Sequence, residues 1–359
     1  MSVEQEFCED NFIRATNQAN RARVATHLLA PKIQEMFPTI FATEPRVTPV
    51  GNQGWLNITL SIDQSDGTQG YILRLAPCAA GSTSRSTPAL EKERYVLERL
   101  SHYDFVPKLP SNPSGRISIV MPSMGKVEYG YLLETRLPFE APRSDKGPRD
   151  RLLILRQLGE RCKTIHEVKV TGYGLDFDEK LPGFSRASFS EFLESKAKGI
   201  EDSSLDANMK RWMLSRVEAL VYLDPEPRLF HYDLLGNWGN FLVDEARTVQ
   251  GIIDWEFAGS GPAFHHEIAS LVYVLTRDGH SPEDIEHDLM AVLEGYGMSY
   301  AHFKAHYERE VETLVLLNSV SALQRYEALK RSGGLQREPW RAIFAERASM
   351  ICARSYRSR

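Results

Sequence analysis

The spacing of hydrophobic and polar positions changes partway along this chain. Up to residue 137, apolar residues occur in short, partly alternating runs, which predict strands at 47–50, 58–62, 71–75, 116–121 and 131–137. After residue 150 the apolar positions recur at helical spacing, in segments near 152–166, 189–223, 268–275, 282–295, 300–332 and 338–354. The pattern therefore predicts an α+β protein whose first part is mainly β and whose second part is mainly helical.

Two further helices are expected, one before the β region and one inside it. Residues 5–37 carry a broken apolar stripe that Pro38 and Pro45 close, which predicts an arm that packs on the next part of the chain. The second helix is expected at 89–101. We expect three parts: a helical arm at 1–45, a β-rich lobe with one helix at 46–137, and a helical lobe at 138–359.

The helix expected at 89–101 places a carboxylate among apolar side chains. Glu93 lies three residues after Leu90 and four before Leu97, on the face that turns toward the core. Arg74 is likewise a cation inside an apolar strand. Because an unpaired buried charge is costly, these two side chains would satisfy one another and leave a donor for an anion such as phosphate. The alternative is two partly exposed charges of little energetic value.

The segment from His231 to Glu256 predicts two short apolar strands joined by a polar turn. Asp233, Asn240 and Asp254 stand at the mouth of this hairpin. Mg²⁺ prefers oxygen ligands and usually takes only one or two protein carboxylates, leaving other positions to water and substrate phosphates. The three side chains therefore suit a magnesium and phosphate site, the alternative being a surface hairpin with solvated carboxylates.

Composition and absent motifs exclude several classes of protein. With 359 residues, a net charge of -5 and no block of like charges, the chain indicates neither a nucleic-acid nor a membrane partner. A secretory signal is not expected at the N-terminus, and four widely spaced cysteines fit the reduced thiols of a cytoplasmic protein. The P-loop, G-x-S-x-G, H-E-x-x-H and C-x-x-C motifs are absent, which disfavours P-loop NTPases, α/β-hydrolases and zinc hydrolases.

The order of these parts resembles the kinase-like phosphotransferases of the aminoglycoside phosphotransferase and choline kinase family. The resemblance covers about residues 46–280. Three motifs carry it: H-Y-D-L…G-N-F-L-V-D from His231, I-I-D-W-E from Ile252, and L-x-x-L-G-E-x-x-x-x-I-H-E from Leu155 followed by G-Y-G. It implies a protein-kinase-like two-lobe fold with a small, mainly β N-lobe containing one helix and a larger, mainly helical C-lobe. It also implies ATP and Mg²⁺ as cofactors and transfer of the γ-phosphate to a hydroxyl of a small molecule.

The resemblance assigns a role to each matching residue. Asp233 would be the catalytic base or orient the hydroxyl, and His231 would brace its loop. Asn240 and Asp254 would bind Mg²⁺, while Arg74, paired to Glu93, would contact the α- and β-phosphates. The remaining implied nucleotide contacts are Gly51, Gly54 and Asn57, which would cover the phosphates, and the backbone near Glu134, Arg136 and Leu137, which would take adenine at the hinge.

Three departures from the family pattern bear on these roles. The family places the Asn five residues after the Asp, whereas Asn240 follows Asp233 by seven, so either the loop has an insertion or Asn237 is the ligand. Asn240 is favoured because it keeps its position before the following strand. Arg74 stands where protein kinases have Lys, and a forked, always charged side chain keeps phosphate binding possible. Glu256 either reaches a second metal or caps the turn, and we favour the cap.

Two alternative functions remain. A nucleotide-binding pseudokinase or regulatory module would fit the altered interval between Asp233 and Asn240. A protein kinase is disfavoured, because only a few residues separate Asp254 from Gly261, where a protein kinase needs a long activation segment. An aminoglycoside-like antibiotic, an amino-alcohol, a choline-like amine and a sugar are all possible acceptors, and neither ATP over GTP nor an oligomeric state is specified.

Overall fold

The chain divides into two compact units. The computed structural model describes residues 22–50, 57–64, 70–78, 86–121, 125–142, 148–178, 183–223, 225–331 and 340–357. Unit 1 contains the described residues up to Phe139 together with Gly251–Glu256, and unit 2 contains Glu140–Gln250 and the described residues from Phe257 onward. The short segment Gly251–Glu256 thus returns to unit 1 from a position far along the chain.

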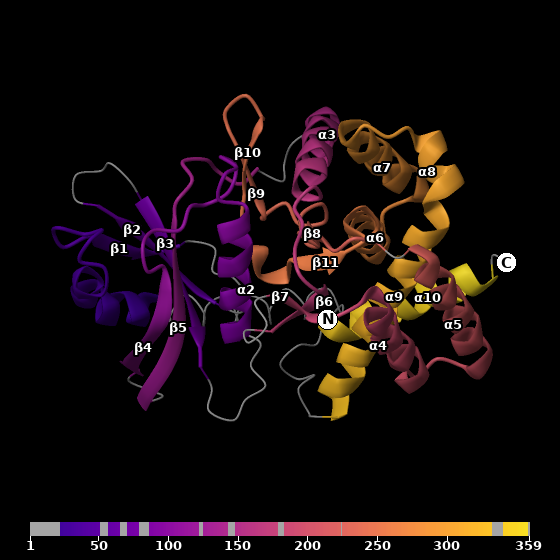
Figure 1. The fold of residues 1–359 in the computed structure, drawn as a ribbon, viewed down its shortest axis with the longest axis horizontal. Coiled ribbons are helices and arrows are strands. Elements are labelled where there is room, and N and C mark those ends of the chain that lie inside the picture. Colours follow the sequence, from indigo (N-terminus) through magenta and orange to yellow (C-terminus); the bar gives the residue numbers. More distant parts are fainter. Residues whose placement is uncertain are drawn as a thin grey trace, which may run out of the picture. The chain divides into compact units, whose positions relative to one another are not determined.

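Unit 1 is built on an antiparallel sheet with the strand order β1-β2-β3-β5-β4 (Figure 1). The strands are β1 (Arg46–Pro49), β2 (Ile58–Asp63), β3 (Gly70–Pro77), β4 (Ser114–Met121) and β5 (Gly125–Thr135). The helix α2 (Ser86–Arg99) contacts β3 and β5. Every strand expected in this region is present, although β5 begins six residues earlier than the pattern predicted.

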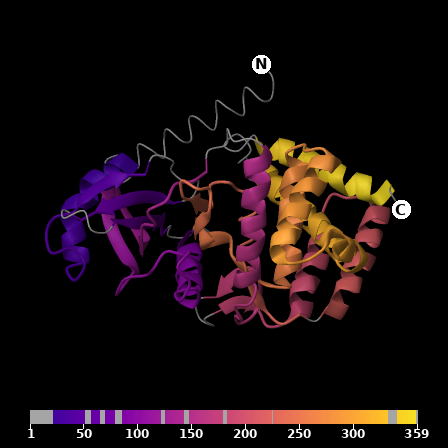
Figure 2. The ribbon, with the colours of Figure 1, turned by 90° about the horizontal axis from the view of Figure 1, so that it is seen from above.

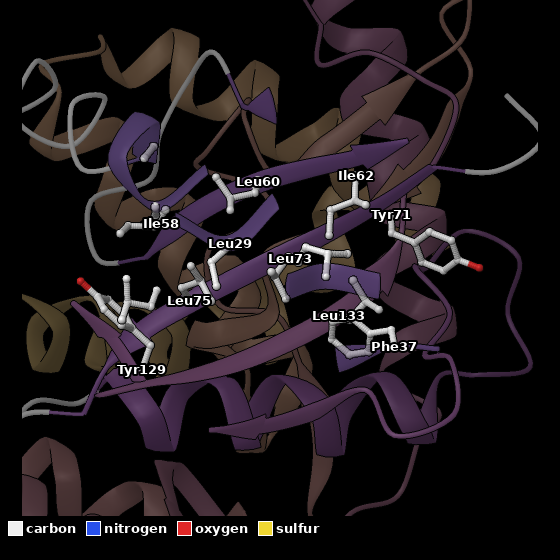
Figure 3. Close-up of a cluster of buried hydrophobic side chains, with 14 of the residues drawn as sticks. Leu29, Phe37, Ile58, Leu60, Ile62, Tyr71, Leu73, Leu75, Tyr129 and Leu133 are labelled. Carbon is white, nitrogen blue, oxygen red and sulfur yellow. The ribbon is translucent and has the colours of Figure 1, made fainter. Parts of the chain in front are cut away.

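A helix at residues 22–36 completes the core of unit 1. Its residues Ala22, Ala25, Leu29 and Ile33 recur at helical spacing and are fully buried against alternate residues of the sheet. Figure 2 shows this indigo helix lying against the sheet, and Figure 3 shows Leu29 and Phe37 among the side chains of β2, β3 and β5. The described part of the expected arm is therefore part of the unit 1 core.

The two faces of this sheet have different roles. Leu73 and Leu75 of β3 turn toward the helix of residues 22–36, so the alternating position Arg74 points to the opposite face. Glu134 of β5 pairs with Ile72, two residues from Arg74, and directly opposed residues share a face. The strand pattern thus brings Arg74 and Glu134 to one side of the sheet.

Unit 2 is mainly helical, as predicted. Its helices are α3 (Pro148–Ile165), α4 (Phe189–Asp202), α5 (Ala207–Leu220), η1 (Val221–Leu223), α6 (Ala263–Arg277), α7 (Pro282–Tyr296), α8 (Tyr300–His306), α9 (Glu308–Arg331) and α10 (Trp340–Arg357). Helices α3 and α7 lie side by side (Figure 1), and glycines allow the close approach. A Cβ atom on Gly159 would lie 2.1 Å from the carbonyl oxygen of Val292. None of the described helices combines the length and apolar character needed to cross a membrane.

Unit 2 also contains strands that the sequence pattern did not predict. A four-stranded sheet has the order β7-β6-β11-β8, from β6 (Tyr173–Asp178), β7 (Gly183–Arg186), β8 (Arg228–Phe230) and β11 (Gly259–Gly261). Three-residue strands such as β8 and β11 are too short to show the periodicity on which such a prediction depends. The single helix expected at 300–332 is two helices, α8 and α9. The predicted hairpin is present as β9 (Phe241–Val243) and β10 (Val249–Ile252), and η2 (Trp255–Phe257) follows it.

Candidate active site

An arginine forked between two carboxylates forms the charged centre of unit 1. Arg74 of β3 uses Nη1 to bind Glu93 of α2 and Nη2 to bind Asp254, which follows β10. The same Oε1 of Glu93 accepts the backbone N–H of Trp255 at 3.1 Å. Glu93 is completely buried, which its place on the apolar face of α2 predicted. The predicted site residues Arg74 and Asp254 therefore meet Glu93, the predicted partner of Arg74, in one cluster.

The backbone at Asp254 supports this arrangement. Asp254 has a φ of +68°, in the left-handed region that residues other than glycine rarely adopt. Short polar residues such as Asp tolerate this conformation better than most. The turn aims the Asp254 carboxylate at Arg74, while the next N–H, that of Trp255, turns to Glu93.

Carboxyl groups outnumber cations around Arg74. Burial raises the pKa of Glu134 to about 8, and the neighbouring Glu93 and Asp254 add to this effect while Arg74 opposes it. Burial and the charge of Asp254 likewise raise the pKa of Glu256 to about 8. The pKa of Arg74 stays above its ordinary value, since these carboxyls outweigh the lowering effect of burial. The cluster thus has acceptor oxygens for a cation, while Glu134 and Glu256 keep their protons at neutral pH.

The other residues predicted to contact the nucleotide lie elsewhere in unit 1 or outside the described residues. Asn57, which is buried, donates from Nδ2 to Oε2 of Glu256 at 2.9 Å. Arg136 is partly exposed, and its side chain binds Ser61 Oγ and Asp63 Oδ1, both at 2.7 Å. Gly51 and Gly54 lie outside the described residues. The sequence predicted a role for the backbone near Glu134, but it did not predict that the Glu134 carboxyl is buried.

In unit 2, a compact loop follows β8 and carries the predicted catalytic residues. His231 is fully buried, and Asp233 follows two residues later. Oδ2 of Asp233 accepts a hydrogen bond from Nδ2 of Asn240 at 3.0 Å and from Nδ2 of Asn237 at 3.1 Å. Asn240 also donates to the backbone oxygen of Asp233 at 2.9 Å. The seven-residue interval therefore brings both candidate asparagines to the same carboxylate oxygen.

The two asparagines differ in their surroundings. Asn240 is buried and stands directly before β9, whereas Asn237 is exposed and accepts the N–H of Gly239 within the turn. Neither hydrogen bond from Asn240 uses its Oδ1, the oxygen that binds metal ions. Asn240 thus keeps its Oδ1 free of these two hydrogen bonds, next to Asp233, and this oxygen is of the type that can bind a metal ion. Asn237 instead accepts a hydrogen bond within the turn between Asp233 and Asn240.

A buried carboxylate supports this loop, and sequence reasoning missed it. Oε2 of Glu267, in α6, accepts the N–H of His231 at 2.9 Å and that of Tyr232 at 3.2 Å. The sequence contained a signal, because Glu267 lies three residues after Phe264 and four before Leu271, on the apolar face of α6. His166, which directly follows α3, is buried beside Glu267, with Nε2 3.8 Å from Oε2.

Two kinds of metal-binding chemistry are present among the described residues. Asp254 in unit 1 and Asn240 and Asp233 in unit 2 offer oxygen atoms of the type that Mg²⁺ prefers. A separate buried group in unit 2, Cys162, His166 and Glu267, has ligand atoms within 4.8 Å of one another. A thiol and an imidazole suit softer metals, and Oε2 of Glu267 already accepts two backbone N–H groups.

Comparison with known proteins identifies the family and the fold of the chain. Residues 47–310 match the model of the phosphotransferase enzyme family, whereas no curated protein sequence matches the chain. The structure resembles aminoglycoside phosphotransferase APH(4)-Ia, with a TM-score of 0.58 at 16% identity over 90% of this chain and 98% of that one. It also resembles amicoumacin kinase hAmiN in complex with AMP-PNP, Ca²⁺ and Ami, with a TM-score of 0.55 at 16% identity over 90% and 93%.

A third similar structure is that of an ethanolamine kinase. The Plasmodium vivax ethanolamine kinase has a TM-score of 0.54 at 14% identity, over 88% of this chain and 84% of that one. At such identities the likeness establishes the fold, and it confirms the predicted α+β, kinase-like architecture. The family match covers well over half of the sequence. This chain belongs to the phosphotransferase enzyme family.

Proposed function

We propose that this protein is an ATP- and Mg²⁺-dependent phosphotransferase that moves the γ-phosphate to a hydroxyl of a small molecule. The observation that carries the proposal is Arg74, forked between Glu93 and Asp254. Phosphoryl transfer needs little covalent work from a protein, only positioning and neutralisation of charge. A fixed guanidinium beside an aspartate that can hold a metal supplies both requirements.

Unit 1 is the proposed nucleotide-binding unit. Arg74 would contact the α- and β-phosphates, and the Asp254 carboxylate is a suitable Mg²⁺ ligand because hard cations prefer carboxylate oxygens. At the end of β5, the N–H groups of Thr135 and Arg136 already donate to Lys108 and Gly70. We therefore place the adenine contacts at the next peptide group, between Arg136 and Leu137. The amicoumacin kinase complex, which contains AMP-PNP and Ca²⁺, supports a nucleotide with a divalent cation.

Unit 2 is proposed to supply the groups that act on the acceptor. Asp233 would accept the proton of the attacking hydroxyl or orient that hydroxyl, a contribution of about 10²–10⁴-fold for a positioned base. The amides of Asn240 and Asn237 hold its carboxylate, and Oδ1 of Asn240 would bind Mg²⁺. A bound Mg²⁺ would supply neutralisation of the negative charge on the phosphates.

The experiment that tests the function is an assay of ADP release with and without candidate acceptors. Aminoglycosides, choline-like amines, amino-alcohols and sugars would each be added with Mg-ATP, with Mg-GTP, and with ATP in EDTA. At least one acceptor should stimulate nucleotide turnover, and EDTA should stop it. Binding of ATP without turnover by any acceptor in the panel would instead favour a pseudokinase. The observed contact between Asn240 and Asp233 weakens that alternative, whose support was the long interval between them.

A further inference from the structure

Three side chains in the interior of unit 2 bring together atoms of the kinds that bind metal ions. They are Cys162 of α3, His166 directly after that helix, and Glu267 of α6, and all three are buried. The N–H of His166 donates to the carbonyl oxygen of Cys162 at 2.8 Å, so the last helical turn places both side chains on one face. The thiol sulfur, a ring nitrogen of His166 and a carboxylate oxygen of Glu267 lie within 4.8 Å of one another.

Two of these side chains each have one polar atom without a hydrogen bond. Nδ1 of His166 lies 3.1 Å from the hydroxyl of Tyr296, while Nε2 is buried and has no hydrogen-bond partner among the described residues. Oε2 of Glu267 accepts two backbone N–H groups, whereas Oε1 is buried and likewise has no partner within the described ranges. Because a buried polar atom without a partner is costly, these two atoms indicate a ligand between α3 and α6.

An ion pair between a protonated His166 and Glu267 is the alternative use of these atoms. Nε2 is 3.8 Å from Oε2, which is too long for a hydrogen bond, and such a pair leaves Oε1 without a partner. It also gives no role to the thiol of Cys162, whose pKa is raised by burial and further by the charge of Glu267. A divalent cation would use an atom from each of the three side chains.

We propose that Cys162, His166 and Glu267 bind a Zn²⁺ ion that joins α3 to α6, with Sγ, Nε2 and Oε1 as the ligand atoms and water in the fourth position. Cysteine, histidine and glutamate are all zinc ligands, whereas Mg²⁺ prefers sites made of oxygen atoms. Binding releases the thiol proton to solvent: Cys–SH and Zn²⁺ give Cys–S⁻–Zn²⁺ and H⁺. The thiolate, the carboxylate and Zn²⁺ together carry no net charge, which suits a buried site.

The positions of the ligand atoms are close to those that Zn²⁺ requires. Three atoms within 4.8 Å of one another enclose a point at most about 2.8 Å from each, and bonds to Zn²⁺ are about 2.0–2.3 Å long. Binding therefore requires each ligand atom to move inward by less than about 1 Å. Tyr296 supports the imidazole, because a partner on the second ring nitrogen orients a histidine that binds zinc.

Replacement of Zn²⁺ by Co²⁺ tests the site by spectroscopy. The full-length protein, prepared without a histidine tag, should contain about one Zn²⁺ per chain by elemental analysis. After removal of zinc, added Co²⁺ should give the visible absorption of a tetrahedral ion and a near-ultraviolet charge-transfer band from thiolate to cobalt. An excess of Mg²⁺ should leave both features unchanged, since Mg²⁺ does not compete for a thiolate.

Cys162→Ser and Cys352→Ser form a matched pair of variants. Cys352 of α10 is also fully buried, but it belongs to no comparable group of metal-binding side chains in the described part of the chain. Cys162→Ser should lose the charge-transfer band and weaken Co²⁺ binding by more than about 100-fold, whereas Cys352→Ser should retain both. Tyr296→Phe removes only the partner of His166, so the band should remain while the affinity falls about 10–100-fold.

These measurements do not depend on phosphoryl transfer, so the zinc site and the proposed function can fail separately. A charge-transfer band that is present in the unmodified protein and lost in Cys162→Ser supports the site. Absence of that band after addition of Co²⁺ to the unmodified protein overturns the proposal, whether or not the variants fold. Equal binding of Co²⁺ by Cys162→Ser also overturns it, because the thiol is then not a ligand.

Discussion

The charged cluster of unit 1 and the proposed catalytic loop of unit 2 are stabilised in different ways. In unit 1, ion pairs join Arg74 to Glu93 and Asp254, and acidic groups remain in excess. In unit 2, Asp233 accepts hydrogen bonds from the amides of Asn237 and Asn240. The backbone before Asp233 is held in turn, because the N–H of His231 donates to the carboxylate of Glu267. The unit 1 cluster is therefore held by ion pairs between buried groups, whereas the unit 2 loop is held by hydrogen bonds of defined length.

This difference predicts two kinds of sensitivity. Interactions between charges respond to cations, pH and the removal of one partner, especially in a buried setting. Hydrogen-bonded geometry responds to changes of length and shape, and tolerates changes of charge as long as an acceptor stays in place. Substitutions in the two regions can strengthen or break this contrast, and the largest effect is expected at the proposed metal ligand of unit 1.

Asp254→Ala should abolish Mg²⁺-dependent transfer while the fold survives. The change removes a proposed metal ligand, so the loss should be at least as large as the roughly 10²–10⁴-fold attributed to a positioned base. Arg74 keeps its bond to Glu93, which protects the core of the cluster. ADP release measured across a Mg²⁺ titration tests the loss, and circular dichroism tests the fold.

Asp63→Ala is the matched control for this prediction. Asp63 also pairs with an arginine of unit 1, Arg136, but the pair is partly exposed. Because exposed ion pairs contribute little, the control should change neither activity nor stability noticeably. Full activity in Asp254→Ala would refute the site assignment.

Asn240→Ala should lower kcat more than Asn237→Ala. Asn240 makes two hydrogen bonds to Asp233 and is the proposed metal ligand, so a loss of roughly 100-fold is expected from misplacement alone. Asn237 supplies one exposed hydrogen bond of about 1 kcal/mol, and its loss should cost less than tenfold. The ratio of the two kcat values decides between them, and a larger loss for Asn237→Ala would identify it as the ligand.

The sequence was sufficient to predict the parts of the site that lie on regular elements. Glu93 could be paired with Arg74 because a helix and a strand each fix which residues face the core. Glu267 also lies on the apolar face of its helix, but the sequence shows no partner of opposite charge for it. Its partners are backbone N–H groups 35 and 36 residues away, which carry no signature of residue type. A pattern of side-chain types therefore cannot predict hydrogen bonds between a side chain and a distant backbone group.

The fold was predictable where elements are long enough to show a period. The sheet of unit 1 and the main helices follow from alternation and helical spacing, whereas β8 and β11 each contain three residues and were missed. Their pairing places Gly259 opposite Phe230, directly before the proposed catalytic loop. This sheet is specified by contacts between distant segments, which a local pattern does not contain.

Arg74→Lys should weaken nucleotide binding and lower stability. A lysine carries a single ammonium group and cannot bind Glu93 and Asp254 through separate nitrogens as the guanidinium does. One carboxylate then loses its partner, at a cost of about 1–3 kcal/mol. Urea unfolding measures this loss, and KM for ATP should rise.

Arg94→Lys on the surface of α2 is its control. Arg94 also bridges two glutamates, Glu91 and Glu98, but in a partly exposed setting. The same substitution there should cost no more than roughly 1 kcal/mol. If the two variants lose equal stability, burial does not distinguish the unit 1 cluster from an ordinary surface network.

At Glu134 we expect a change in how the stability of the protein depends on pH. Its pKa is raised from 4.5 to about 8 in the folded protein, mainly by burial. Between these two values the folded protein keeps a proton that the unfolded chain has released, so stability falls as pH rises through this window. Glu134→Gln is neutral throughout, so its thermal midpoint in EDTA should rise relative to the unmodified protein as pH increases from 4.5 to 8. Parallel curves for the two proteins would show that the cluster does not hold Glu134 in its protonated form.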